Sequence, residues 1–96
     1  MTPRAPYSFK PSAERELARL PRAARIAFWQ AVDLLLETPT RPRPGLDIRR
    51  LRGTRTVWRL RFSRYRALYQ WDGAIVRFVL IEHRETVYRR LGELGL

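Results

Sequence analysis

The stretch WRLRFSRYRALYQW, residues 58–71, decides the fold, because it reads as two β-strands joined by a short turn. Residues 56–62 alternate with the period of two that is typical of a strand with one buried face. The apolar side chains of this alternation are Trp58, Leu60 and Phe62, and the side chains between them are Val57, Arg59 and Arg61. We therefore predict a sheet with one face packed under helices and an open face that presents arginine.

Turn signals and apolar runs predict further strands in this sheet. Residues 63–64 form the turn of the first hairpin, and the Asp-Gly pair at 72–73 is a strong signal for a second one. The run IVRFVLI, residues 75–81, is nearly all apolar and predicts a central strand covered on both faces. Residues 6–10 predict a short first strand, and residues 48–51 are a weaker candidate.

Two helices are predicted between the first strand and the rest of the sheet. Ser12 offers an N-cap for the first helix, whose apolar residues recur at helical spacing. Pro21 ends that helix and can open the second, an amphipathic helix over residues 22–37. The proline-rich residues 38–45 predict a loop, and residues 85–94 predict a last short helix.

The predicted order of elements is β-α-α-β-β-β-α. It indicates an α+β fold in which an N-terminal strand and an αα-hairpin pack on a small antiparallel β-sheet, followed by a short C-terminal helix. A length of 96 residues suits one core, so residues 1–96 are predicted to form a single domain.

The charge is strongly positive and unevenly spread, with a formal net charge of +11. Residues 1–48 hold eight basic and five acidic side chains, whereas residues 49–96 hold twelve basic and four acidic ones. Residues 41–66 alone contain ten arginines and one acid, Asp47. Such a field favours a polyanionic partner, which we interpret as RNA. The alternative is a charged surface that serves only to keep the protein in solution.

The composition also excludes several kinds of site. There is no cysteine, so disulfides and thiolate metal sites are excluded. With one histidine and no clustered carboxylates, we predict no metal and no other cofactor. No apolar run approaches the roughly 18 residues of a membrane span, and the N-terminus has no apolar signal segment. We therefore expect a cytoplasmic protein with no membrane association.

Arg59 and Arg61 are the first candidates for contact with RNA. Side chains two apart on a strand stand about 7 Å apart on one face, so the two cations can straddle a phosphodiester. The alternative is that they are ordinary charged positions on a solvent-facing strand. The further arginines predicted to bind nucleic acid are Arg49, Arg50, Arg52 and Arg55. Strand spacing favours packing over stacking on bases for the aromatic residues Trp58, Tyr65, Tyr69 and Trp71.

Several motifs follow one another along the chain: the αα-hairpin, LRG at 51–53, WRLRF at 58–62, YRALY at 65–69 and HRETVY at 83–88. In this order and spacing the chain resembles the RelE/ParE superfamily of type II toxin–antitoxin toxins. The arginine and tyrosine after the last strand resemble the RelE-like mRNA interferases. The resemblance implies a microbial-ribonuclease-type fold and a metal-independent, ribosome-dependent mRNA endoribonuclease. In that reaction the 2′-OH attacks the adjacent phosphate, which leaves a 2′,3′-cyclic phosphate and a 5′-OH.

The same resemblance implies roles for individual residues. The two basic strand positions of the family fall on Arg59 and Arg61, and the arginine of its YR motif falls on Arg66. The arginine after its last strand falls on Arg84, and its tyrosine on Tyr88. The arginines would grip the scissile phosphate, and Tyr88 would stack on a base or assist the nucleophile.

The chain departs from the family pattern at the expected proton acceptor. The better-understood nucleases have lysine in the strand or glutamate upstream of the LxG motif, where this chain has arginine and Arg49. Arginine stays protonated near neutral pH and cannot serve as a base. Catalysis then relies either on positioning and charge stabilisation or on proton transfer by His83. Glu82 and Glu85 are weaker candidates for this proton transfer, and we interpret them mainly as surface or ion-paired residues.

The resemblance also implies partners and alternatives. An acidic antitoxin would cover the basic face in a toxin–antitoxin hetero-oligomer, and the ribosome with its mRNA would be the target. One alternative is a ParE-like inhibitor of DNA gyrase without catalysis of its own. Another is an RNA-binding module that does not cleave.

Overall fold

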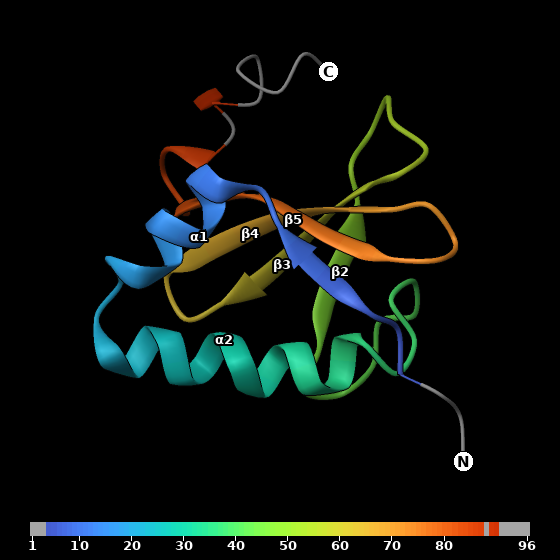
Figure 1. Cartoon of the computed structure of the whole chain (residues 1–96), viewed down its shortest axis with the longest axis horizontal. Coiled ribbons are helices and arrows are strands. Elements are labelled where there is room, and N and C mark those ends of the chain that lie inside the picture. Colours follow the sequence, from blue (N-terminus) through green and yellow to red (C-terminus); the bar gives the residue numbers. More distant parts are fainter. Residues whose placement is uncertain (1–3, 88, 91–96) are drawn as a thin grey trace.

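The computed structural model describes residues 4–87, 89 and 90 (Figure 1). It confirms the α+β class. The elements in chain order are β1 (Tyr7–Phe9), α1 (Pro11–Ala18), α2 (Arg22–Leu35), β2 (Asp47–Arg50), β3 (Val57–Phe62), β4 (Tyr65–Trp71) and β5 (Val76–His83). The five strands form one sheet in the order β1-β5-β4-β3-β2.

The predicted antiparallel arrangement is confirmed for β2 to β5, whereas β1 pairs parallel to β5. The loops from β2 through β5 are short, and short connections force neighbouring strands to run in opposite directions. Because β1 reaches β5 only through the αα-hairpin and three other strands, no short loop fixes its direction. Tyr7 lies opposite Val76 in this parallel pair.

Both helices of the predicted αα-hairpin are confirmed, but the predicted N-cap is wrong. The first helix begins at Pro11, and no side chain caps its N-terminus. Proline at the first helical position fixes φ at a helical value and has no amide hydrogen to leave unsatisfied, so Ser12 is not needed as a cap. Near the other end of this helix, Glu16 accepts a hydrogen bond from the amide of Ile81 at 3.1 Å. This contact covers the edge of β5 beyond β1.

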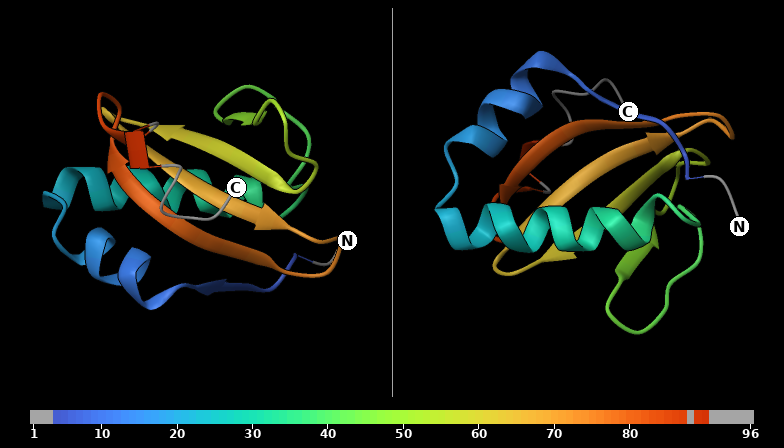
Figure 2. Two further views of the ribbon diagram at one scale, coloured as in Figure 1. Left: turned by 90° about the horizontal axis from the view of Figure 1, so that it is seen from above. Right: turned by 60° about the horizontal axis from the view of Figure 1, so that its bottom comes forward.

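One face of the sheet carries the main core. Figure 2 shows α2 lying across the strands on this side, with α1 beside the sheet edge. Phe28 of α2 is fully buried, and its ring centroid lies 5.2 Å from those of Phe62 and Phe78. Leu60 and Tyr69 are also fully buried in the same cluster. The prediction that the apolar positions of β3 face the helices is therefore confirmed.

The alternation had predicted that the opposite face is open. In the structure, part of this face is covered. A second apolar cluster lies there, formed by Val57, Leu68, Val79, Leu80 and Val87, with Leu51 packed against it. Val87 lies in a short turn of 3₁₀ helix after β5, so the chain that follows the last strand folds back over this face. This cluster confirms that β5 is covered on both sides. Of the helix predicted at 85–94, residues 85 and 86 form a turn and residues 87, 89 and 90 have 3₁₀ geometry, so the described part is not α-helical. Residues 88 and 91–94 lie outside the described residues.

No helix in the described part of the chain is long and apolar enough to cross a membrane.

Candidate nucleic-acid interface

Four charged residues lie in one row across β2, β3, β4 and β5. Asp47 pairs with Arg61, Arg61 with Arg66, and Arg66 with Glu82. Residues directly opposite each other in neighbouring strands have their side chains on the same face of the sheet. Since Leu60 faces α2, this row lies on the face turned away from that helix. The register thus places two arginines between two acids.

Arg59 is more buried than its strand position predicted. Only 12% of its side chain is exposed, and its guanidinium donates a hydrogen bond of 2.6 Å to Oδ1 of Asp47. Among the described residues, nothing accepts a hydrogen bond from its buried Nε. Arg59 is therefore a fixed cation held by one carboxylate, beside the second apolar cluster.

Arg61 is the strand arginine that solvent can reach. Half of its side chain is exposed, and its Nη1 lies 3.8 Å from Oδ2 of Asp47, beyond hydrogen-bond distance. It lines an open groove of about 590 Å³ with Asp47 and the end of the proline-rich loop. The guanidinium of Arg43 in that groove donates to the backbone oxygens of Leu34, Thr38 and Arg41, so it supports the loop. Arg61 is thus the exposed cation that faces this groove.

Arg66 is buried within the same row. It is 7% exposed, and it donates a hydrogen bond of 2.9 Å to the carbonyl of Tyr65. Its neighbour in the row, Glu82, is bound by Arg90 at 2.8 Å. Burial raises the pKa of Glu82, but hydrogen bonds from Arg90, the His83 amide and Thr86 outweigh burial and hold that pKa below its usual value. Glu82 is therefore a fixed anion of the row.

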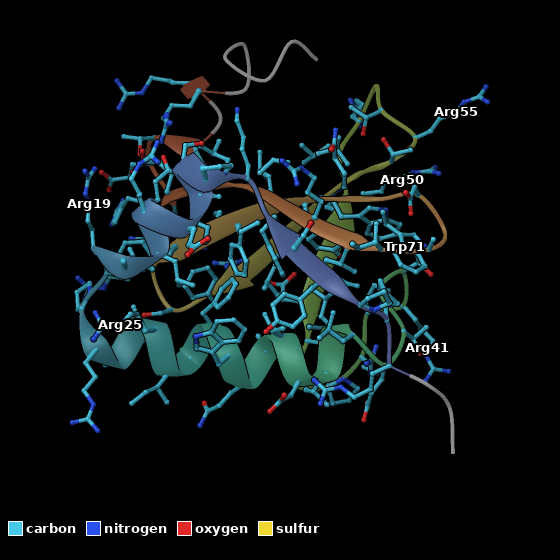
Figure 3. The ribbon with its side chains drawn as sticks, viewed as in Figure 1. Arg19, Arg25, Arg41, Arg50, Arg55 and Trp71 are labelled. Carbon is cyan, nitrogen blue, oxygen red and sulfur yellow. The ribbon has the colours of Figure 1, made fainter. Side chains whose placement is uncertain are left out.

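A second groove lies beside Arg59, where β2 passes into the 51–56 loop. Its volume is about 620 Å³, and the arginines that line it are Arg49, Arg50, Arg52 and Arg59. Gly53, at φ +84°, takes the tight turn of this loop, and Thr54 closes it by donating to the carbonyls of Leu51 and Val57. Arg55 does not line the groove. Figure 3 shows Arg55 at the outer end of the loop, pointing away from the sheet.

The residues after β5 lie at the other end of the row. The amide of Arg84 donates to the carbonyl of Arg64 at 3.0 Å, so the exposed Arg84 stands beside the turn between β3 and β4. His83 pairs with Tyr65, and their rings meet edge to face at 5.6 Å. The register therefore places His83 on the face opposite to Arg66. Tyr88 lies outside the described residues.

The imidazole of His83 has a backbone partner. Its Nδ1 accepts a hydrogen bond of 3.3 Å from the amide of Glu85. The carbonyl of His83 accepts from the amide and the hydroxyl of Thr86. These contacts stabilise the turn that follows β5, which is a structural task for this residue.

Asp47 is the functional candidate that motif reading missed. It contacts both strand arginines, one through each carboxylate oxygen. The sequence held one signal for it, since it is the single acid among the ten arginines of residues 41–66. Without the register of β2 against β3, nothing indicated which arginines it meets.

The strand aromatics pack as predicted. Tyr69 is fully buried, and its hydroxyl donates to the carbonyl of Pro39 at 2.7 Å. Burial raises the pKa of Tyr69 well above its usual value, against a smaller opposite effect of Arg43. The other strand aromatics pack against the main core: Trp58, Tyr65 and Trp71. In the described part of the chain, no group of three or more histidine or carboxylate side chains is placed to hold a metal ion.

Comparison with known proteins places this arrangement in a family. The family model described as "ParE toxin of type II toxin-antitoxin system, parDE" matches residues 7–88. The chain is 31% identical over 77 residues to the RelE1 protein of Methanocaldococcus jannaschii, a match that spans 78% of this chain and 84% of that protein.

Solved structures show the same fold. A chain in the crystal structure of the archaeal RelE–RelB complex from Pyrococcus horikoshii OT3 matches with a TM-score of 0.69 and 26% identity, over 88% of this chain and 97% of that one. A mutant of the E. coli toxin RelE in the free state matches with a TM-score of 0.75 and 24% identity, over 98% of this chain and 100% of that one.

Proposed function

The chain belongs to the ParE toxin family of the RelE/ParE superfamily of type II toxin–antitoxin toxins, and from this premise we propose that it is a ribosome-dependent mRNA endoribonuclease. The reaction is the attack of a 2′-OH on the adjacent phosphate, which yields a 2′,3′-cyclic phosphate and a 5′-OH. The transition state is a crowded phosphorane with more negative charge on its oxygens than the ground state. Fixed cations that face this charge lower the barrier.

The observation that carries the proposal is the fixed set of arginines on one face of the sheet. Arg61 is half exposed in one groove, and Arg59, largely buried, borders a second one. Buried cations are already oriented before the substrate arrives, so little reorganisation is needed when charge develops on the phosphate. In this proposal Arg61 contacts the scissile phosphate, and Arg59 and Arg66 supply positive potential beneath it.

The arginines around the second groove and at the end of β5 extend the surface. Arg49, Arg50 and Arg52 would hold the backbone of the message on one side of the scissile phosphate, with Arg55 reaching further out. Arg84 would contact the phosphate from the end of β5, and Tyr88 would stack on a base. His83 would contribute through the turn that it stabilises, since its Nδ1 is bound to the amide of Glu85.

The test is expression of the chain under tight control, with the 5′ ends of cellular mRNA mapped afterwards. Cuts positioned by codon in translated messages are expected, and they should disappear in Arg61→Ala and in Arg84→Ala. Arg19→Ala is the matched control, since Arg19 is exposed at the turn between the helices and lines neither of the two arginine grooves (Figure 3). Intact messages in cells that accumulate the folded wild-type protein would refute the nuclease proposal.

The second candidate function is inhibition of DNA gyrase, favoured by the ParE description of the matching family model. It predicts growth arrest with intact mRNA and with double-strand breaks in DNA. The same induced cultures therefore separate the two functions, because mRNA ends and DNA breaks are scored in parallel.

An acidic antitoxin is proposed as the protein partner. Three large apolar side chains are exposed on β1 and α2: Tyr7, Ile26 and Trp29. A groove of about 420 Å³ beside Trp29 is bordered by Arg22, Arg25 and Asp33, and the carboxylate of Asp33 is bound by Arg4. The groove has an apolar centre, and arginines outnumber acids on its border. Such a surface suits an amphipathic acidic segment. Two of the similar solved structures, from Pyrococcus horikoshii and Methanococcus jannaschii, are complexes of RelE with RelB. Trp29→Ala should weaken co-purification with the acidic product of an adjacent gene.

A further inference from the structure

The arginine face lacks an obvious group to accept the proton of the 2′-OH, because guanidinium stays charged at neutral pH. Two carboxylates lie in its charged row, Asp47 on β2 and Glu82 on β5. A carboxylate is the side chain that can both stay ionised near neutral pH and accept a proton in the transition state. The choice between the two depends on which has a free oxygen that faces a groove.

Glu82 has no oxygen to offer. Its Oε2 is bound by Arg90 at 2.8 Å, and Arg90 also binds Glu16. Its Oε1 accepts a hydrogen bond of 3.0 Å from the amide of His83. Both oxygens are thus engaged in contacts that hold α1 and the chain after β5 to the sheet.

Asp47 is arranged differently. Its Oδ1 is fixed by Arg59 at 2.6 Å, whereas its Oδ2 lies 3.8 Å from Arg61, outside hydrogen-bond distance. About half of its side chain is exposed, and it lines the 590 Å³ groove together with Arg61. One oxygen therefore orients the carboxylate, and the other faces the space where a phosphate bound to Arg61 would lie.

We propose that Asp47 is the general base of the cleavage reaction, an inference that rests on the proposed nuclease function. Oδ2 takes the proton of the 2′-OH while O2′ forms its bond to phosphorus. The bond from phosphorus to O5′ breaks, its electron pair stays on O5′, and water supplies the proton that makes the 5′-OH. Asp47 afterwards returns its proton to water. Arg61 neutralises the phosphate oxygens, and Arg59 positions the base.

The charged groups around Asp47 fix its position. Arg59 and Arg61 face it from β3, and Arg49 lies on the same face of its own strand. Arg43, in the loop across the groove, uses its guanidinium on three backbone oxygens. These arginines surround the carboxylate and hold it at the edge of the groove. Among the described residues, no second carboxylate lines this groove.

The decisive variant is Asp47→Asn, which keeps an oxygen for Arg59 but cannot accept the proton. Single-turnover cleavage of mRNA on purified ribosomes should fall by about 10²- to 10⁴-fold, the usual effect of losing a general base. Affinity for ribosomes that carry a 2′-O-methyl message, which cannot be cleaved, should stay the same or increase. Glu14→Gln removes the same charge from an exposed site on α1 and should cleave like the wild type.

The pH dependence of the rate gives a readout that a structural role would not change. In the wild type, the logarithm of the rate should rise with unit slope at acid pH and then level off as Asp47 ionises. Asp47→Asn should lose this limb. Asp47→Glu, which restores a carboxylate, should regain the limb at a lower rate, and it serves as the test if the asparagine variant does not fold.

Wild-type cleavage in Asp47→Asn, or faster cleavage, would overturn the assignment and identify Asp47 as a counter-ion that competes with the message. Loss of the acid limb in a folded Asp47→Glu would overturn it as well. A wild-type protein that leaves ribosome-bound mRNA intact would overturn the nuclease proposal itself and this inference with it. The first two results leave the proposed function standing.

Discussion

Replacing Arg61 and Arg59 by alanine, one at a time, separates binding from folding. The two side chains stand two residues apart on the same strand and contact the same carboxylate. They differ in burial, since half of the Arg61 side chain is exposed and only 12% of the Arg59 side chain. We therefore expect Arg61→Ala to impair RNA binding with little loss of stability, and Arg59→Ala to destabilise the fold.

The size of each effect follows from the contacts. An exposed ion pair such as that of Arg61 contributes about 0–1 kcal/mol, which in a chain of this length shifts Tm by at most about 8 °C. Arg59 makes a short hydrogen bond to a carboxylate from a largely buried position. Losing such a charged hydrogen bond costs about 1.5–3 kcal/mol, or about 6–24 °C in Tm.

Two measurements check this pair of variants. Thermal unfolding followed by circular dichroism gives both Tm values under one buffer condition. Fluorescence anisotropy with a short 2′-O-methyl RNA at several salt concentrations gives the affinity and its salt dependence. Each lost phosphate contact should reduce the slope of log affinity against log salt by about 0.7. A Tm loss of more than about 8 °C in Arg61→Ala, or an unchanged slope, would refute the assignment of Arg61 as an exposed phosphate contact.

Three further predictions concern stability. Phe28→Ala should lower the free energy of unfolding in urea by about 3–5 kcal/mol, whereas the exposed Ile26→Ala on the same helix should stay within about 0.5 kcal/mol. Tyr69→Phe should cost about 0.5–1.5 kcal/mol at neutral pH through the lost bond to Pro39. Because burial raises the pKa of Tyr69, only the unfolded chain ionises above about pH 10, so wild-type stability should fall there and the variant should lack this loss. The pKa of Glu82 is lowered in the folded protein, so the ionised side chain stabilises the fold, and this contribution should be lost as the pH falls below about 4.3. In urea titrations, the free energy of unfolding of Glu82→Gln should therefore fall less steeply with decreasing pH than that of the wild type.

Most of the elements could be predicted from the sequence because their signals are local. The alternation in residues 56–62, the Asp-Gly turn at 72–73 and the helical spacing of residues 22–37 each depend on neighbours within a few positions. The main error of this kind was Ser12, where a good capping residue stands directly after a proline that begins the helix itself.

The candidate site was predicted only in part. Arg61 lies exposed where the alternation put it, but Arg59 on the same face is largely buried. Strand alternation assigns a face and says nothing about what lies over it. The guanidinium of Arg59 is bound by Asp47 of β2, and Leu68 of the second apolar cluster lies opposite it on β4, so its surroundings come from other strands.

By itself, the sequence determined the secondary structure, the side of the sheet that packs against the helices, and the concentration of positive charge in residues 41–66. These properties follow from periodicity, turn chemistry and composition, which need no knowledge of distant contacts. The tertiary structure decided the parallel pairing of β1 with β5, the covering of the second face, and the row that joins Asp47, Arg61, Arg66 and Glu82. Strand register and burial depend on which distant segments meet, and they separate the arginine exposed in a groove from the one held beneath the surface.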